Sequence, residues 1–595
     1  MFIIEDNCPI GERGSAVDAR RGGLSLWAGL ATLVLLFGIG APGSPARAQA
    51  VPQGSPIPRV MPPAPPQVSP AQPQAPLAIG TSVPNRPVRV TRVAIEGVTA
   101  YPVARIAALT QGLTGSAVPL PKVEAAREAV LRLYRSDGYV LTAVSASLGP
   151  HGTLRFVVTE GRIASVKLSG NIGPAGVQVL RFLHRLTEQR PINAATLERY
   201  LLLAQDVPGV SLHAVLQPST SEPGALDLIA EVSRRKVGGL FTTDNYASTY
   251  TGPEESLGVF DLNSFTEFGE QTQIVLYHTW PNSQTFGQIS EQAFLGSSGL
   301  RLKLYGGAGH TTPTGALAAE GYLGITTVFG AELSYPVIRA RQQTLNTYAD
   351  FDALESEISL SAGGVRSRAS YDSLRVARIG FDYARSDLLA GNDRGAVNAL
   401  TVRLSHGLGI LGASRDGATD APRVGERTDF FKVNFQASRT QTLFSPWKNA
   451  SVALMGLLAG QWSADILPPA EEFYLGGFQY TRGYYAGEVS GDKALAATAE
   501  LQLNTAINLQ KLGLSESVAA QFFAFYDWGE TWQNDKFGLD EHVSSIGGGV
   551  RLSVTRYAEV DFTGLTRVNV YPAGSGASIS ALRGSAFYWR VLARF

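Results

Sequence analysis

The chain has 595 residues, of which 44% are hydrophobic, with 64 glycines, 33 prolines, seven histidines and one cysteine. Lys plus Arg and Asp plus Glu both number 50, so no overall basic charge indicates a nucleic-acid partner. A single cysteine excludes a disulfide scaffold, a cysteine-based zinc site and an iron–sulfur protein. A mean hydropathy close to zero excludes a helical membrane protein, because only one apolar run approaches spanning length.

Residues 1–50 have the pattern of a secretory signal peptide. Arginines precede an apolar run over Leu24–Ile39, and small residues in Ala-x-Ala spacing follow it. We therefore expect cleavage after Ala48 or Ala50. A single membrane anchor is the alternative, and it is less favoured because two prolines interrupt a helix directly after the apolar run.

Residues 51–87 contain twelve prolines. Proline has no backbone N–H to donate to a sheet, so we expect an extended linker rich in polyproline II conformation. A ligand for a proline-binding partner is the functional alternative.

From residue 88 onward, two segments repeat the order strand, helix, helix, strand, strand. In residues 88–160, the hydrophobic periods predict these elements over 90–95, 103–113, 123–134, 140–147 and 154–159. In residues 161–235, they predict them over 163–168, 177–186, 194–204, 211–217 and 225–232. The sequence therefore predicts two small α+β modules.

This repeated order resembles tandem POTRA (polypeptide-transport-associated) domains. The segments that carry the resemblance are Ile95-Glu96-Gly97, Tyr134…Gly138-Tyr139 and Thr159-Glu160-Gly161-Arg162-Ile163. A small mixed sheet leaves an edge strand to which an extended polypeptide adds by main-chain pairing. Two ordinary α+β domains without a ligand are the alternative.

Residues 236–595 alternate apolar with polar side chains over segments of about ten residues, which is typical of a transmembrane antiparallel β-barrel. We count sixteen candidate strands, and fourteen or eighteen remain compatible with the length. The last segment ends at Phe595 and resembles the terminal signal that barrel-assembly machinery recognises during biogenesis. The fold class is therefore mainly β with two small α+β modules. A soluble β-sandwich is the alternative.

The most informative stretch is Leu475–Tyr485, which reads LGGFQYTRGYY. It resembles the conserved loop of two-partner secretion transporters (the TpsB family of ShlB/FhaC/HecB-type haemolysin secretion/activation proteins). In that family the loop folds into the lumen between strands eleven and twelve, and the resemblance places it here at about 471–493. Five predicted strands follow, over 494–506, 518–528, 542–555, 557–567 and 584–595, which agrees with sixteen in total. The loop residues implied are Gly476, Gly477, Arg482, Gly483, Tyr484, Gly491 and Asp492, and Glu500 follows them.

The resemblance also implies an acidic partner for the loop arginine on strand thirteen. The family motif Phe-x-Tyr/Phe-Asp-x-Gly falls here on Phe525–Gly529, so Asp527 is assigned to Arg482, with Gly529 beside it. A bidentate guanidinium–carboxylate contact would hold a loop that has no packed core. Gly483 would let the turn pass close to the wall. Two unrelated lumen charges are the alternative.

The resemblance implies an outer-membrane transporter of a Gram-negative envelope, with POTRA domains in the periplasm. It would export one large unfolded exoprotein of adhesin or cytolysin type. We expect no catalytic residue, metal or cofactor, and contact with outer-membrane lipid but not nucleic acid. A monomer is expected. Many family members begin with an amphipathic helix that plugs the pore, but residues 51–87 show none, which puts a plug in doubt.

Three other functions remain as alternatives. A barrel-assembly or insertase protein of the same superfamily usually carries more POTRA modules than this chain has room for. A barrel enzyme such as a lipase lacks support, because no Gly-x-Ser-x-Gly or His-Glu-x-x-His motif occurs. We interpret His278 and His406 as wet lumen residues rather than catalysts. A passive porin would need no N-terminal modules.

Overall fold

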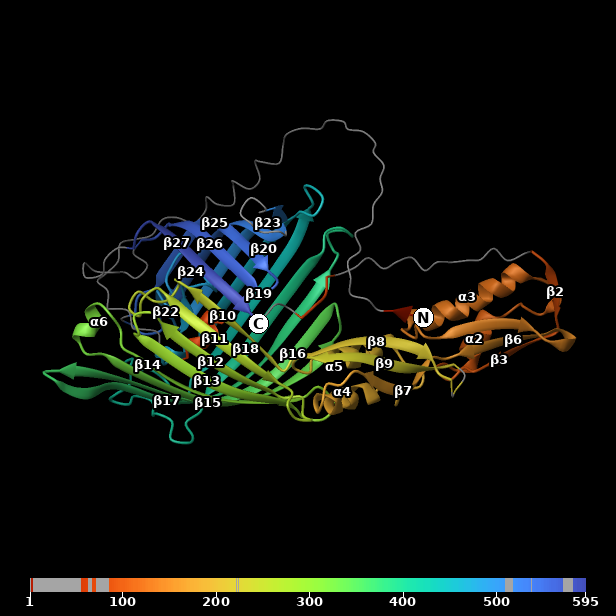
Figure 1. Cartoon of the computed structure of the whole chain (residues 1–595), viewed down its shortest axis with the longest axis horizontal. Coiled ribbons are helices and arrows are strands. Elements are labelled where there is room, and N and C mark those ends of the chain that lie inside the picture. The colour runs from red at the N-terminus through yellow and green to blue at the C-terminus, as the bar shows by residue number, and fades with distance from the viewer. Residues whose placement is uncertain are drawn as a thin grey trace, which may run out of the picture.

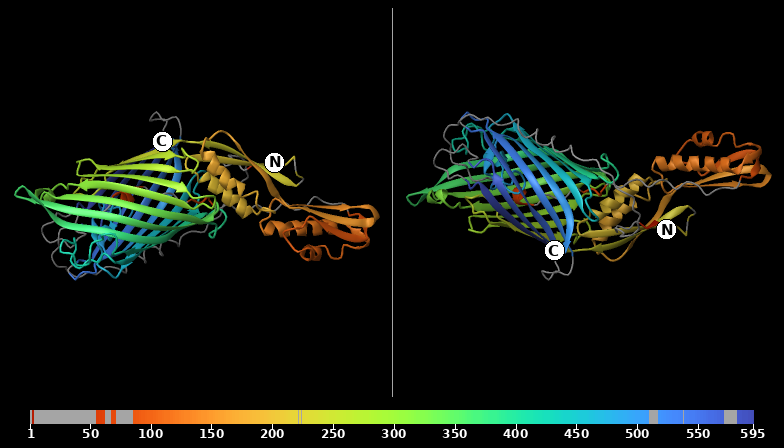
Figure 2. Two further views of the ribbon diagram at one scale, coloured as in Figure 1. Left: turned by 90° about the horizontal axis from the view of Figure 1, so that it is seen from below. Right: turned by 90° about the horizontal axis from the view of Figure 1, so that it is seen from above.

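The computed structural model describes residues 2–3, 55–61, 67–70, 85–220, 222, 224–508, 517–536, 538–570 and 582–595. The predicted signal peptide, apart from residues 2–3, and most of the proline-rich linker lie outside the described residues. Two α+β modules extend in line from one end of a barrel, which we call the module end (Figure 1, Figure 2). No helix in the described ranges is long and apolar enough to cross a membrane.

The first module has the predicted order and adds a two-stranded sheet that the sequence did not predict. Its elements are β3 (Arg92–Glu96), α2 (Val103–Leu109), α3 (Leu120–Ser136), β5 (Ala143–Leu148), the 3-10 turn η1 (Pro150–Gly152) and β6 (Thr153–Thr159). The sheet order is β3-β6-β5, with β3 parallel to β6. The added sheet pairs β2 (Pro87–Val90) antiparallel with β4 (Gly115–Pro119), and β3 and α2 lie between these strands in the chain. The sequence did not indicate this pair, because proline and glycine, which have low strand propensity, lie at the ends of its strands.

Glu160, at the end of the first module, joins the turn after β3 to helix α3. Its Oε1 accepts the backbone N–H of Thr99 at 2.8 Å, that of Ala100 at 2.9 Å and the Tyr134 hydroxyl at 2.6 Å. Partial burial raises the pKa of this carboxyl, but the hydrogen bonds outweigh burial, so its pKa lies below the ordinary value. These contacts explain the glutamate of the Thr159-Glu160-Gly161 segment, because it holds the turn after β3 and helix α3 together.

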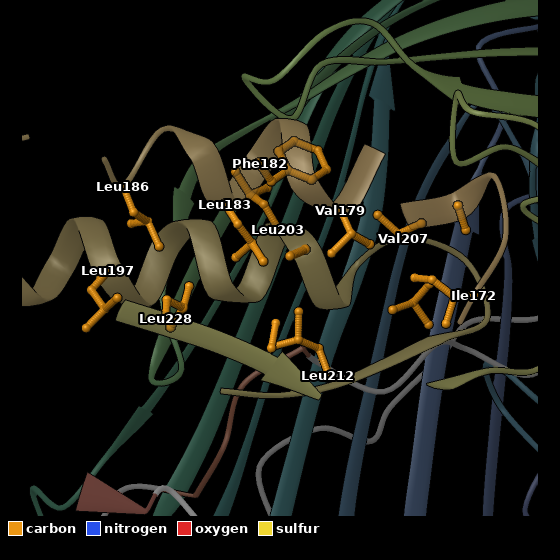
Figure 3. Close-up of a cluster of buried hydrophobic side chains, with 14 of the residues drawn as sticks. Ile172, Val179, Phe182, Leu183, Leu186, Leu197, Leu203, Val207, Leu212 and Leu228 are labelled. Atoms are coloured by element: carbon orange, nitrogen blue, oxygen red, sulfur yellow. The ribbon is translucent and has the colours of Figure 1, made fainter. Parts of the chain in front are cut away.

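The second module repeats the arrangement and packs against the barrel. Its elements are β7 (Arg162–Ser169), α4 (Ala175–His184), α5 (Ala194–Gln205), β8 (Val210–Pro218) and β9 (Ala225–Arg234). Val179 and Leu183 of α4 point toward α5 and the sheet (Figure 3), and Phe182 packs against Phe294 of the barrel, with ring centres 5.1 Å apart. Strand β1 (Phe2–Ile3) pairs antiparallel with the β8 edge, which gives the order β1-β8-β9-β7.

Sixteen antiparallel strands close into a barrel, which confirms the predicted strand number. The first eight are β10 (Val237–Asp244), β11 (Glu255–Asn263), β12 (Gln271–Thr279), β13 (Gln284–Phe294), β14 (Arg301–Thr311), β15 (Leu323–Arg339), β16 (Gln343–Ala362) and β17 (Val365–Asp387). The others are β18 (Ala396–Gly407), β19 (Phe431–Phe444), β20 (Ser451–Ser463), β23 (Lys493–Asn508), β24 (Ser517–Trp532), β25 (Glu541–Thr555), β26 (Ala558–Arg567) and β27 (Ser585–Arg594). A short helix α6 (Ala316–Ala319) lies between β14 and β15, and β10 pairs with β27 to complete the ring.

The outer surface of the barrel carries exposed apolar side chains, and it also carries the two histidines that the sequence placed in the lumen. His278 shares the outward face of β12 with the exposed Leu276, because alternate side chains of a strand share a face. His406 pairs across the ladder with the exposed Phe431. The interpretation of both as lumen residues was therefore wrong. Alternation shows that neighbouring residues of a strand face opposite sides of the wall, but it shows which side is the lumen only once the register is known.

Candidate functional site

The segment between β20 and β23, the eleventh and twelfth barrel strands, folds back into the barrel as the sequence predicted. It contains the 3-10 turn η2 (Pro469–Glu471) and a hairpin stem in which β21 (Phe473–Leu475) pairs antiparallel with β22 (Val489–Gly491). We call residues 464–492 the inward loop and residues 476–487 its tip.

The tip begins with a turn that requires glycine. Gly476 and Gly477 have φ angles of +98° and +88°, and a Cβ on Gly476 would lie 1.9 Å from the Tyr485 carbonyl oxygen. The Gly476 N–H donates to Thr481 Oγ1 at 2.8 Å, and the Gly477 N–H donates to the Tyr484 carbonyl at 2.8 Å. These bonds fold the tip onto itself and direct residue 482 toward the wall.

Arg482 makes the contact with Asp527 that the sequence predicted. Its Nε lies 3.0 Å from Asp527 Oδ2, its Nη2 lies 2.9 Å from Oδ1, and its backbone N–H donates to Oδ2 at 2.9 Å. Asp527 is fully buried and also accepts the Thr498 hydroxyl at 2.9 Å. The guanidinium lies 3.8 Å above the centre of the Phe525 ring. The loop is thus fixed in orientation as well as position.

A second carboxylate, Glu500 of β23, completes a network that sequence reasoning did not assign. Its fully buried side chain accepts a hydrogen bond from Arg482 Nη1, and it lies 2.7 Å and 3.1 Å from Nη1 and Nη2 of Arg551 on β25. Together with Arg482 and Asp527, Glu500 and Arg551 form a network of two guanidinium groups and two carboxylates, whose charges balance. Alternation places Arg551 on an inward position, but it does not tell which inward residues meet.

The residues after Arg482 lie directly against the wall. A Cβ on Gly483 would come within 2.5 Å of the Ser545 Cβ, so a larger residue would push the tip inward. The Gly483 carbonyl accepts a hydrogen bond from Arg567 Nε. Tyr484 is fully buried and accepts the Ser544 N–H at 3.2 Å. A Cβ on Gly529 would lie 2.8 Å from the side chain of Leu475, so this glycine gives the loop room.

Asp492 does not lie near Arg482 but belongs to a separate cluster at the stem. Its two oxygens accept Nη1 and Nη2 of Arg423 at 2.7 Å and 3.1 Å, and also the Leu467 N–H at 2.7 Å. Gly491 beside it packs against β24, where a Cβ would lie 2.8 Å from the Thr531 Cβ. Because Arg423 comes from the long β18–β19 connection, no sequence motif indicated this pairing.

The other side of the stem is held by Glu471. Its carboxylate lies 2.8 Å from Lys432 Nζ of β19 and 2.7 Å from Arg378 Nη2 of β17. The inward loop is therefore anchored to the wall at three places, the tip and both sides of the stem. A cavity of about 220 Å³ remains between the tip and strands β19, β20, β23 and β25.

The described part of the proline-rich segment also enters the barrel. The single helical turn α1 (Ile57–Val60) buries Ile57 against inward side chains of β11, β12, β13 and β15. Gln479 of the tip donates to the Pro58 carbonyl at 2.6 Å. At the module end, the Ser69 N–H donates to the Arg341 carbonyl at 2.6 Å. The linker thus occupies part of the lumen, although no amphipathic plug helix was predicted.

Comparison with solved structures shows the same fold. CdiB from Escherichia coli has a TM-score of 0.67 at 17% identity, and the match covers 89% of this chain and 94% of that one. CdiB from Acinetobacter baumannii has a TM-score of 0.61 at 17% identity with the same coverage. A sequence search of curated proteins finds no match.

Two protein-family models match the sequence. Residues 88–161 match the ShlB-type POTRA domain, and residues 229–552 match the haemolysin secretion/activation protein ShlB/FhaC/HecB. The second match covers more than half of the chain and includes the inward loop together with Asp527, Glu500 and Arg551, which hold its tip. The chain therefore belongs to the ShlB/FhaC/HecB family of haemolysin secretion/activation proteins, outer-membrane barrels whose POTRA domains lie in the periplasm.

Proposed function

We propose that this protein secretes, and thereby activates, a large partner exoprotein by two-partner secretion. The observation that carries the proposal is the family match, which spans the inward loop and most of the barrel. The closed sixteen-strand barrel supplies a passage, and the two modules supply periplasmic surfaces for capture. The exoprotein would be of adhesin or cytolysin type, and barrel-assembly machinery would insert the transporter.

Capture would use strand addition at the second module. Strand β8 forms an edge of the sheet, where Phe2–Ile3 of the predicted signal peptide pair antiparallel opposite Leu216 and Val215. Removal of the signal peptide would leave this edge open to an extended segment of the exoprotein. Main-chain pairing supplies affinity for an extended segment without requiring one sequence, and alternate side chains supply selectivity. An unfolded exoprotein presents such segments, whereas a folded one does not.

Passage through the lumen would require two displacements. The tip lies inside the barrel against Asp527, and Ile57 of residues 55–61 covers part of the apolar wall. Because the tip is anchored by charged groups, it can shift only as those groups find new partners or water. No nucleotide-binding motif occurs, so folding of the exported protein outside the cell would supply the direction of transport.

The test is secretion of the long, repeat-rich exoprotein expected to be encoded beside this gene. The exoprotein should appear in the medium when both genes are expressed and should stay in the periplasm when this chain is deleted. A variant exoprotein that cannot fold outside should be exported more slowly. Unchanged secretion without this chain, or a general loss of outer-membrane proteins on its deletion, would contradict the proposal.

The lumen segment leads to a separate prediction. Ile57→Asp removes about 1.5–3 kcal/mol of apolar burial, so residues 55–61 should leave the wall and the barrel should conduct more current. Single-channel recording in planar bilayers measures the change. Val103→Asp, at an exposed position of the first module, is the matched control and should leave conductance unchanged. Equal conductance of wild type, Ile57→Asp and Val103→Asp would show that residues 55–61 do not restrict the lumen.

A further inference from the structure

The module end of the barrel carries basic side chains where β10 and β27 close the ring. Arg235 and Lys236 connect the second module to β10, and Arg556 lies in the β25–β26 turn; all three are exposed. Of the arginines on β27, Arg590 is paired with Asp561 inside the barrel and Arg594 with Glu559. Within the described part of the chain, no carboxylate forms an ion pair with Arg235, Lys236 or Arg556. These three cations therefore have no direct ion-pair partner among the described residues.

Exposed aromatic side chains lie at the same end of the barrel. Phe265, Tyr557 and Phe595 are 50%, 39% and 47% exposed. Arg556 lies 4.5 Å from the Tyr557 ring centre, and the adjoining Arg234 lies 5.7 Å from that of Phe265. Exposed aromatic rings and exposed cations thus occur together at this end of the barrel.

Backbone contacts make this surface continuous across the closure. The Arg594 N–H donates to the Tyr557 carbonyl at 2.6 Å, and the Phe595 N–H donates to the Gly239 carbonyl at 3.1 Å. The Phe595 ring lies 5.8 Å from that of Phe260 on β11. We call the combined surface the rim patch, which consists of Arg235, Lys236, Arg556, Phe265, Tyr557 and Phe595.

The rim patch continues the surface that faces lipid. Val237 and Phe241 alternate with the buried Thr242 and Asp244 along β10, so their exposed side chains lie on the outside of the barrel. Arg235 precedes them by two residues at the module end. This end lies in the periplasm, where the membrane leaflet consists of phospholipid.

We propose that the rim patch binds anionic phospholipid headgroups of the periplasmic leaflet. Aromatic rings are enriched at the level of the headgroups, and basic residues directly outside a spanning segment attract anionic lipid. Both features occur together here, at the point where the first and last strands meet. Zwitterionic lipid would gain only the aromatic contacts. This site does not depend on transport of an exoprotein.

The experiment uses the full chain in nanodiscs of phosphatidylcholine and phosphatidylglycerol mixed 3:1. Native mass spectrometry after release into mild detergent counts the lipids of each kind that remain bound. We expect wild type to retain phosphatidylglycerol selectively, and the triple variant Arg235→Gln/Lys236→Gln/Arg556→Gln to lose at least about tenfold of that selectivity. Raising the salt concentration should weaken it in wild type.

The matched control removes three exposed charges from the first module, Arg86→Gln/Arg89→Gln/Arg135→Gln, and should keep the selectivity of wild type. Heat-modifiable migration on gels checks that each barrel is folded. Equal retention of the two lipids by wild type would overturn the proposal. So would unchanged selectivity in the rim-patch variant, or an equal loss in the control.

Discussion

Arg482→Ala is expected to stop export of the exoprotein while leaving the sixteen-strand barrel assembled. Glu500 would keep Arg551 as a partner, but Asp527 would stay buried and lose Arg482, the only cation that pairs with it in the described part of the chain. Breaking a buried pair in this way costs about 3–5 kcal/mol, which is enough to release the tip from the wall. Quantifying exoprotein in the medium and folded barrel in the outer membrane measures both parts of the expectation.

Matched variants separate geometry from charge. Arg482→Lys should also fail, because an ammonium group cannot make the two parallel contacts with Asp527. Arg403→Ala is the control, because Arg403 lies on β18 and its Nε is 3.4 Å from the Tyr348 hydroxyl, outside the inward loop. This variant should secrete the exoprotein normally. Normal secretion by Arg482→Ala would remove the role proposed for this contact.

Exchange of the two charged residues is not expected to restore export. Asp527 accepts the Arg482 backbone N–H and the Thr498 hydroxyl as well as the guanidinium, and an arginine at 527 could accept neither. An aspartate at 482 would also face Glu500. An isolated ion pair would tolerate the exchange at least in part, but the network around this pair does not. Asp527→Ala should share the secretion defect.

The barrel was predictable because alternation acts locally. The strands expected over 494–506 and 542–555 are Lys493–Asn508 and Glu541–Thr555 in the structure, and the terminal strand also falls within a residue of its predicted bounds. A period of two is imposed by a wall with lipid on one side and a wet lumen on the other. Strand number follows from counting such periods. Strand register does not, which is why His278 and His406 were placed on the wrong face.

The loop was predictable only through its resemblance to a family motif. That motif named Arg482 and Asp527, and the structure brings them together. Contacts that join segments without a motif were missed, such as Arg551 with Glu500 and Arg423 with Asp492. Each depends on which inward side chains meet across the lumen, and that is set by barrel closure and strand stagger rather than by any local pattern. The lumen position of Ile57 was missed for the same reason.

Asp206→Ala is expected to loosen the second module from the barrel. Asp206, at the end of α5, binds Nε and Nη2 of Arg339 at 2.8 Å and 2.7 Å, and Arg301 lies 3.4 Å away. Asp206 and Arg339 are both nearly buried, so removing the carboxylate leaves two neighbouring arginines without it, at a cost of about 3–5 kcal/mol. Hydrogen exchange of α5 should rise markedly, and export should fall because captured exoprotein is no longer delivered to the lumen.

The control is Glu188→Ala in the same module. Glu188 forms an exposed pair with Arg185 at 2.9 Å, and such pairs contribute about 0–1 kcal/mol, so exchange and export should stay near wild type. Other contacts at the interface, such as Arg199 with the Pro336 carbonyl at 2.8 Å, remain in both variants. If Asp206→Ala showed the same hydrogen exchange and the same export as Glu188→Ala, the other contacts alone would hold the module against the barrel. The buried ion pair would then not be needed to deliver captured exoprotein to the lumen.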